Sequence, residues 1–288
     1  MAGQEGGTLN TQSDARKVSP PDIHPLAALL RGFAVDFITG HDIAVAERIM
    51  APEYCLSIGG HLLNGRDAEY LPPTAAQIHQ FPGLCVTVHD VIYGENALAM
   101  KFTEHGASSR DGGRAATWRG VTLFRTDGRK LSRGWAEEDY FARKRQLTTG
   151  ICDAVDPPHP MPWDVQPAAP DLEVESVARR WLCSGEGRAG FPGANWLSKV
   201  DDSDPQPDAL VDIQATTIDE LFSAGNRVAF HLQHEARYRG GFAGLDSALV
   251  GSAVTVRAAG MLTVCGGEVV EASITTDRLG LYRSLRFG

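Results

Sequence analysis

Three consecutive runs of alternating residues, within the stretch from Leu98 to Leu147, constrain the fold of this chain most strongly. They predict strands over roughly Ala97–His105, Ala116–Arg125 and Lys130–Tyr140. The turn Thr126-Asp127-Gly128 separates the second run from the third, and Asp-Gly between alternating runs is a strong hairpin signal. The sequence therefore predicts an antiparallel meander in this region.

The same layout returns near the C-terminus, roughly 140 residues later. Val228–Tyr238 and Val254–Val264 read as strands, and a Gly266-Gly267 turn leads into Glu268–Asp277. A repeat of this length predicts two domains. The expected organisation is a disordered leader over 1–22, a first domain over 23–150, a Pro-rich linker over 151–170 and a diverged second domain over 171–288.

Both copies resemble the SnoaL-like branch of the NTF2-like superfamily. The shared pattern is a strand–turn–strand with Asp-Gly or Gly-Gly, then an acid four residues past a tryptophan-like position, which is Asp139 after Trp135 and Asp277 after Ser273. The resemblance implies an α+β fold of two tandem cone-shaped domains. Each would be a curved antiparallel sheet packed with N-terminal helices around an apolar pocket.

Helical spacing of apolar residues supports this fold class. In the first copy, Leu26–Phe37 and Ile43–Met50 predict two helices, and a third over Asp67–Gln80 is expected to break at Pro72-Pro73. In the second copy, Asp171–Cys183 has an apolar helical face, whereas Ser184–Asp208 is rich in Gly, Asp and Pro. The second pocket is therefore expected to be incomplete.

Composition disfavours several classes of function. The net charge is −9 with no basic run, so nucleic acid and anionic membranes are poor partners. No apolar stretch approaches the roughly 20 residues that cross a bilayer. The five cysteines are odd in number and scattered, without a CxxC pair, which fits a reducing cytoplasm. The absence of GxGxxG, P-loop and GxSxG motifs predicts chemistry without a cofactor.

Asp139 and His105 are the catalytic candidates. The resemblance implies that Asp139 is the general acid or base, and the hairpin is expected to bring it towards His105 across the sheet. The alternative for Asp139 is a salt bridge at the sheet edge with an arginine such as Arg143, and the alternative for His105 is a surface position at a strand end. By strand parity, Glu137 is expected to point inward with Asp139, and Glu138 outward.

Pocket or core positions are predicted for a further set of residues, with core the more common role for each aromatic taken alone: Trp118, Trp135, Phe102, Met100, Tyr54, His61 and Tyr70. In the second domain, Asp277 and Tyr238 occupy the positions equivalent to the acid and the histidine. His231 and His234 lie on opposite faces of one strand, so no metal site is expected there.

The sequence leads to one functional hypothesis and two alternatives. The hypothesis is a cofactor-independent lyase, isomerase or cyclase that acts on a small apolar oxygenated ring compound, polyketide-like or aromatic. The first alternative is a non-catalytic ligand-binding or assembly module. The second is an epoxide hydrolase, which requires an Asp–Arg–Asp cluster in the pocket. The two copies are expected to pair within the chain as a pseudo-dimer, with further homodimerisation possible.

Overall fold

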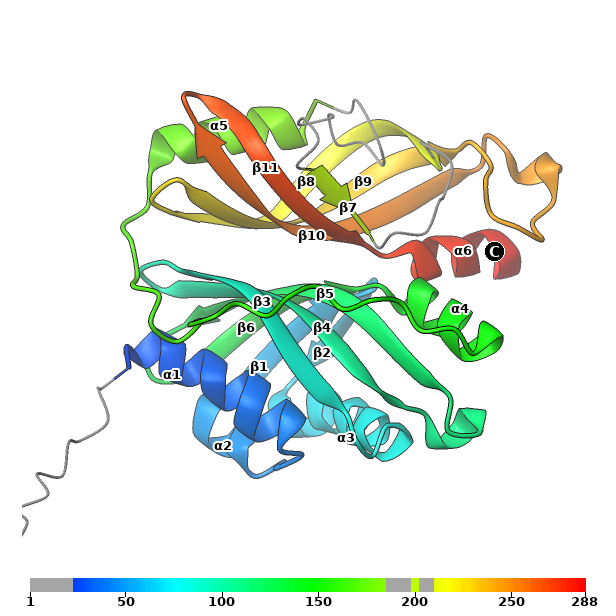
Figure 1. Ribbon diagram of the computed structural model, residues 1–288. Helices are drawn as coiled ribbons and strands as arrows, with labels where there is room; N and C mark the ends of the chain where they lie inside the picture. The colour runs from blue at the N-terminus through cyan, green and yellow to red at the C-terminus, as the bar shows by residue number, and fades with distance from the viewer. Residues whose placement is uncertain (1–22, 185–197, 202–209) are drawn as a thin grey trace, which may run out of the picture.

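The computed structural model describes residues 23–184, 198–201 and 210–288. The predicted leader, 1–22, and most of the Gly/Asp/Pro-rich segment, 184–208, lie outside the described residues. The described chain forms two β-sheets that lie face to face, one from each half of the sequence, with helices on the outer side of each (Figure 1). The predicted α+β class is confirmed.

The first sheet has six strands in the order β2-β1-β6-β5-β4-β3. Their bounds are β1 Met50–Ile58, β2 His61–Asn64, β3 Cys85–Tyr93, β4 Ala97–Ala107, β5 Ala115–Thr126 and β6 Leu131–Glu138. The predicted meander is present as β4, β5 and β6, which pair antiparallel. The resemblance implied a fully antiparallel sheet, but this sheet contains one parallel pair. β1 pairs parallel to β6, because the chain leaves the first helices and enters the sheet beside the last strand of the meander.

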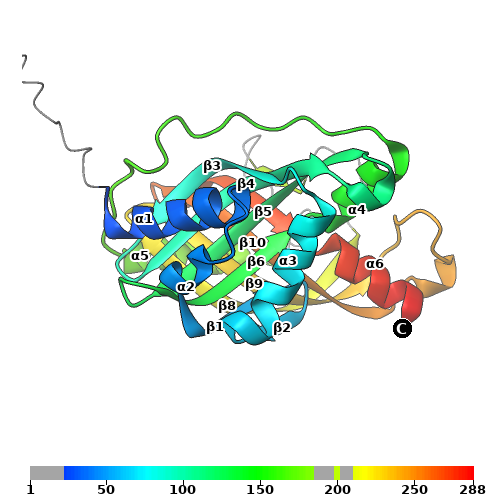
Figure 2. The same cartoon turned by 90° about the horizontal axis from the view of Figure 1, so that it is seen from below.

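Helices cover the concave face of the first sheet (Figure 2). They are α1 Pro25–Arg31, its π-helical continuation η1 Gly32–Thr39, α2 Val45–Ile49, the π-turn η2 Arg66–Tyr70 and α3 Leu71–Gln80, with a 3₁₀ turn η3 at Ser109–Asp111. The expected break at Pro72-Pro73 is wrong. These prolines occupy the first turn of α3, where a missing backbone N–H costs no hydrogen bond.

The second sheet has five strands in the order β7-β11-β10-β9-β8. Their bounds are β7 Ser198–Val200, β8 Val211–Ala224, β9 Arg227–Tyr238, β10 Ala253–Cys265 and β11 Glu268–Thr276. Helix α5, Leu172–Leu182, lies on the outer face and buries Ala178 and Leu182 against the sheet. A 3₁₀ turn η4, Ser247–Leu249, precedes β10, and helix α6, Arg278–Phe287, follows β11.

Apolar side chains, five of them alanines, fill the space between the two sheets. They form one buried cluster drawn from both halves, which includes Ala99, Val121, Leu123, Ala229, Ala259 and Met261. Ion pairs flank it: Arg125 Nη2 lies 2.6 Å from Glu220 Oε1, and Arg227 pairs with Asp90. The alanines let the two backbones approach closely where they lie, and the flanking ion pairs fix how the sheets are aligned.

The Pro-rich segment between the halves lies along the edge strand β3 (Figure 2). After α4, Tyr140–Thr149, the chain runs extended, and the backbone N–H groups of His159 and Ala168 donate to the carbonyls of Val88 and Tyr93, at 2.8 and 3.0 Å. Trp163 packs against the first core. This segment therefore covers what is otherwise an open sheet edge.

No helix in the described part of the chain is long and apolar enough to cross a membrane. All five cysteines lie in described residues and are unpaired.

Candidate functional site

A cavity of about 1380 Å³ opens into the concave side of the first sheet. Its inner wall is mainly apolar, and includes Phe33, Tyr54, Leu56, Met100, Phe102 and Phe124. Residues of the second half line its outer part, among them Arg257, Asp277 and Arg283. The cavity is large enough for a small organic molecule of several rings.

Two carboxyl side chains reach this apolar wall, Glu104 of β4 and Glu138 of β6. Glu104 pairs with Trp118 across β4 and β5, and Gly120 pairs with Glu138 across β5 and β6. Positions 118 and 120 share a face of β5, so both acids lie on the concave face. Glu104 is only 5% exposed.

Polar donors hold each of the two carboxyls. The Gln77 side-chain amide donates to Glu104 Oε2 at 2.6 Å, and the indole N–H of Trp118 donates to Glu138 Oε2 at 2.9 Å. Tyr140, the second residue after Glu138, also lines the cavity. The two acids therefore have fixed orientations before any ligand binds.

Burial raises the pKa of both acids, and the charge of Glu138 adds to the rise for Glu104. For Glu104 the largest cause is desolvation, followed by the charge of Glu138, and the pKa lies well above its usual value. Desolvation also raises the pKa of Glu138, while hydrogen bonds from Tyr140 and Trp118 and the charge of Arg143 oppose the rise. Two close carboxyls in a dry site lose their protons in separate steps, so one can be neutral while the other is ionised.

Gly120 makes room for this arrangement. A Cβ atom at this position would lie 2.4 Å from the Phe102 ring and 3.0 Å from Glu138 Cγ. Any side chain on residue 120 would therefore displace the phenyl ring or the carboxyl arm.

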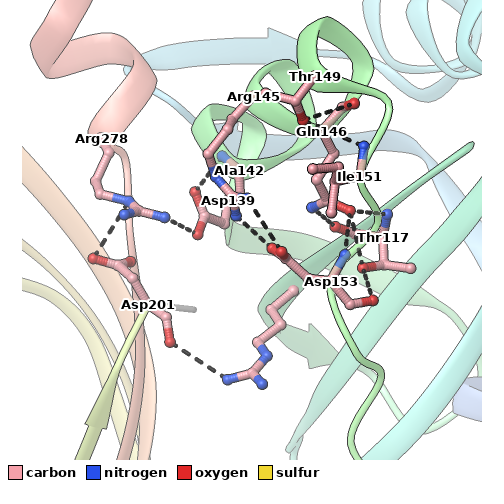
Figure 3. Close-up of polar contacts among 11 residues, drawn as sticks. Thr117, Asp139, Ala142, Arg145, Gln146, Thr149, Ile151, Asp153, Asp201 and Arg278 are labelled. Carbon is pink, nitrogen blue, oxygen red and sulfur yellow. Dashed lines mark hydrogen bonds and ion pairs between the residues drawn. The ribbon is translucent and has the colours of Figure 1, made fainter. Parts of the chain in front are cut away.

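The structure places Asp139 outside this cavity. Its side chain is almost fully buried, accepts a hydrogen bond from the backbone N–H of Ala142 at 3.0 Å and pairs with Arg278 of the second half (Figure 3). Asp139 is thus the N-cap of α4 and an anchor between the halves. The predicted salt bridge is present, but it reaches across the two halves rather than to Arg143.

The expected approach of His105 to Asp139 is wrong. His105 pairs with Thr117 on β5, and its Nε2 lies 3.0 Å from the Thr87 hydroxyl on β3, whereas the Asp139 backbone N–H donates to the Arg119 carbonyl. Strand alternation sends Glu104 into the cavity and His105 to the opposite face.

Most of the other predicted residues do line the cavity: Met100, Phe102, Tyr54, His61 and Tyr70. Trp118 is buried beside it and holds Glu138. Trp135 is the exception, because it lies on the other face of β6, where the Arg133 guanidinium stacks on its ring at 4.9 Å.

The parity assigned to Glu137 and Glu138 is also wrong. On β6 the small residues Gly134 and Ala136 face inward with Glu138, while Glu137 faces the second sheet. There Glu137 Oε1 lies 3.1 Å from His231 Nε2, whose Nδ1 lies 2.8 Å from Asp219 Oδ2. Burial raises the pKa of Glu137 to about 7, and the two carboxylates raise the pKa of His231 against the opposing effect of its own burial.

The second-half equivalents have separate positions. Asp277 caps α6, where its carboxylate accepts from the Gly280 N–H at 2.7 Å, and it lines the outer part of the cavity. The Tyr238 hydroxyl accepts from the Phe242 N–H at 3.0 Å within a separate apolar cluster. The structure brings neither residue to Glu104 or Glu138.

Sequence reasoning missed the carboxyl pair, although one signal for Glu104 was present. The alternation of Leu98, Met100 and Phe102 continues to Glu104, which places a carboxyl at the end of an apolar face. For Glu138 the only local signal was the pair of small residues Gly134 and Ala136, which leave space on the cavity side.

No protein-family model and no curated protein matches this sequence. Among solved structures, the chain is similar to a protein provisionally described as a polyketide cyclase from Acidithiobacillus ferrooxidans, with 18% identity over 43% of this chain and 94% of that one and a TM-score of 0.38. A provisionally described SnoaL-like polyketide cyclase from Jannaschia shares 14% identity over 52% of this chain and 98% of its own, with a TM-score of 0.39.

A provisionally described hydroxylase from Streptomyces galilaeus shares 14% identity over 44% of this chain and 98% of its own, with a TM-score of 0.39. Each likeness therefore spans about half of the present chain. The assignment of the site in this chain rests on the positions of Glu104 and Glu138 in the cavity and not on these similarities.

Proposed function

We propose that this protein is a cofactor-independent acid–base enzyme whose active site is the cavity of the first half. The observation that carries the proposal is the pair of carboxyls, Glu104 and Glu138, each held by its own donor beside the aromatic and aliphatic side chains of the inner cavity wall. Groups of one type whose environments separate their proton affinities are suited to opposite roles in proton transfer.

Glu138 is the general base and Glu104 the general acid in this proposal. Glu138 receives the Trp118 N–H bond and a bond from Tyr140, both of which favour its ionised form. The pKa of Glu104 is displaced further upward, so Glu104 keeps its proton. Ionised Glu138 removes a proton next to a substrate carbonyl, and neutral Glu104 returns a proton at a second atom. The net result is isomerisation, cyclisation or elimination.

A small, largely apolar, oxygenated ring compound fits this cavity best. Aromatic and aliphatic side chains make up most of the inner wall, and the two acids lie beside a few further polar side chains, among them Gln77, Thr122 and Tyr140. The second half acts mainly as a partner in an intrachain pseudo-dimer, and it also supplies the outer wall through residues such as Arg257 and Asp277. The proposed domains keep the expected boundaries, 23–150 and 171–288.

The test is a turnover screen with aromatic and polyketide-like ketones, lactones and diols. Glu138→Gln should reduce turnover at least about 100-fold, the low end of the contribution of general acid–base catalysis. Glu137→Gln is the matched control, since it changes the adjacent carboxyl on the opposite face of the same strand, and it should keep turnover. Full activity in Glu138→Gln would overturn the proposal.

A non-catalytic ligand-binding module remains the alternative. It would bind the same compounds and leave them unchanged in every variant. The epoxide hydrolase alternative has less support. An Asp–Arg–Asp group does exist as Asp139, Arg278 and Asp201, but among the described residues it lies between the two halves and not along the cavity wall (Figure 3).

A further inference from the structure

Arg143 of α4 lies behind the wall that carries the two cavity carboxyls. Its guanidinium carbon lies over three aromatic rings, 4.2 Å from the ring centroid of Tyr140, 4.9 Å from that of Trp118 and 5.6 Å from that of Phe81. It makes no ion pair with any residue in the described ranges 23–184, 198–201 and 210–288, and it does not line the cavity. A half-buried cation is therefore held in place without a directly bound anion.

Arg143 is connected to each of the two carboxyls through one intermediate side chain, Gln77 for Glu104 and Trp118 for Glu138. Arg143 Nη1 donates to Gln77 Oε1 at 3.4 Å, and the Gln77 amide donates to Glu104 at 2.6 Å. The guanidinium also stacks on Trp118, whose indole N–H donates to Glu138 at 2.9 Å. A positive charge that polarises a donor strengthens the hydrogen bond this donor makes to an anion.

We propose that Arg143 is a positioning residue that keeps one member of the Glu104–Glu138 pair ionised at neutral pH, without touching the substrate. This inference depends on the proposed function for its biological meaning. The charge of Arg143 lowers the pKa of both acids, against the desolvation that raises it. Without this charge, burial would be opposed only by the neutral hydrogen-bond donors, and the pKa of the acid that serves as the base would rise further.

A structural role alone would be satisfied by packing. The three stacked rings join α4 to β5 and to the segment after α3, so a side chain of similar size would preserve much of that contact. Two substitutions distinguish a role in packing from a role of the positive charge. Arg143→Met keeps the volume and removes the charge, whereas Arg143→Lys keeps the charge on a shorter, non-planar group.

The experiment is a carboxyl titration by NMR on the full chain labelled at the glutamate side-chain carbon. The Glu104 and Glu138 signals would be assigned with Glu104→Gln and Glu138→Gln. In Arg143→Met both signals should titrate at higher pH than in the wild type, by roughly one pH unit for the closer acid. In Arg143→Lys they should return most of the way to the wild-type midpoints. Lys144→Met is the matched control, since Lys144 is the next cation on α4 and lies over Tyr282 instead.

Unchanged midpoints in Arg143→Met, or equal shifts in Arg143→Met and Lys144→Met, would overturn the inference. If Arg143→Met does not fold, Arg143→Gln carries the same comparison with a neutral polar group. The readout needs no substrate, so its failure is distinct from failure of the proposed function, which depends on turnover in Glu138→Gln.

Discussion

The two halves place an acid at the same point of the fold, but the paired carboxyls on the inner wall of the cavity, Glu104 and Glu138, both belong to the first half. Asp139 and Asp277 follow the last strand of their sheets, cap the next helix and have nearly identical backbone angles, φ −77° and ψ 66° against φ −78° and ψ 65°. The residue just before the cap is Glu138 in the first half. In the second half it is Thr276, whose hydroxyl bonds to Asp201 at 2.8 Å. The repeated acid thus marks a helix start, and the position before it carries the difference in chemistry.

The outer faces of the two sheets also differ. The first sheet curves around a cavity beneath its helices, whereas α5 lies directly on the second sheet and buries Leu182 in a cluster with Phe230, Leu232 and Ile274. A face whose side chains are packed against a helix has no room for a ligand. The same strand pattern can therefore support either a site or a filled core, depending on the helices above it.

The largest expected effect is a difference in the free energy of unfolding between variants of the two cap acids, Asp139 and Asp277. Asp139→Ala should lower the free energy of unfolding by about 3–5 kcal/mol, because it leaves buried Arg278 without its main partner and removes a cap. Asp277→Ala should cost about 1 kcal/mol, since it removes a cap alone. Urea unfolding measures both values. Equal losses would show that the two acids have the same role.

A phenylalanine-to-alanine substitution should destabilise the protein more in the second half, where α5 packs on the sheet, than in the first half, which contains the cavity. Phe102 and Phe230 each lie against a strand glycine, Gly120 and Gly260, but Phe102 also borders the cavity. Phe230→Ala should cost about 3–5 kcal/mol, and Phe102→Ala distinctly less, because fewer packed atoms surround its ring. The comparison fails if Phe102→Ala is the more damaging change in the same unfolding assay.

The Glu137 carboxyl, which lies between the sheets, should make the free energy of unfolding depend on pH. Burial raises the folded-state pKa of Glu137 from 4.5 to about 7, so the folded protein binds more protons than the unfolded chain between these values. The stabilisation is present below pH 4.5 and is lost as pH rises through about 7, with a slope of up to about 1.4 kcal/mol per pH unit. Glu137→Gln should flatten this decline in unfolding experiments between pH 5 and 8. An unchanged slope would contradict the assignment.

Much of the fold could be predicted from the sequence, because local signals determined it. The Asp127-Gly128 hairpin, the alternation of Leu98, Met100 and Phe102 and the return of the pattern after Val228 all refer to neighbouring residues or to strand period. These signals predicted the meander, the repeat and the inward positions of Met100 and Phe102.

Less of the candidate site could be predicted from the sequence, because the site depends on strand parity and on contacts between distant segments. Taking Trp135 as inward reversed every side chain to the end of β6, since a shift of one residue exchanges the two faces. The pairing of Asp139 with Arg278 joins residues of different halves, and no local pattern indicates it. The donors Gln77 and Trp118 become relevant only once α3 and β5 are placed around Glu104 and Glu138.

The most direct test of the account is methyl NMR of the methionines during titration with 1-tetralone, a small apolar ring ketone. Met100 lines the first-half cavity, Met261 lies between the sheets and Met161 is exposed on the linker. Methionine-to-leucine variants would assign the signals. The account predicts a saturable shift of the Met100 signal, with Met261 and Met161 unchanged. A shift of Met261 without Met100, or no saturable shift at all, would contradict a ligand site in the first half.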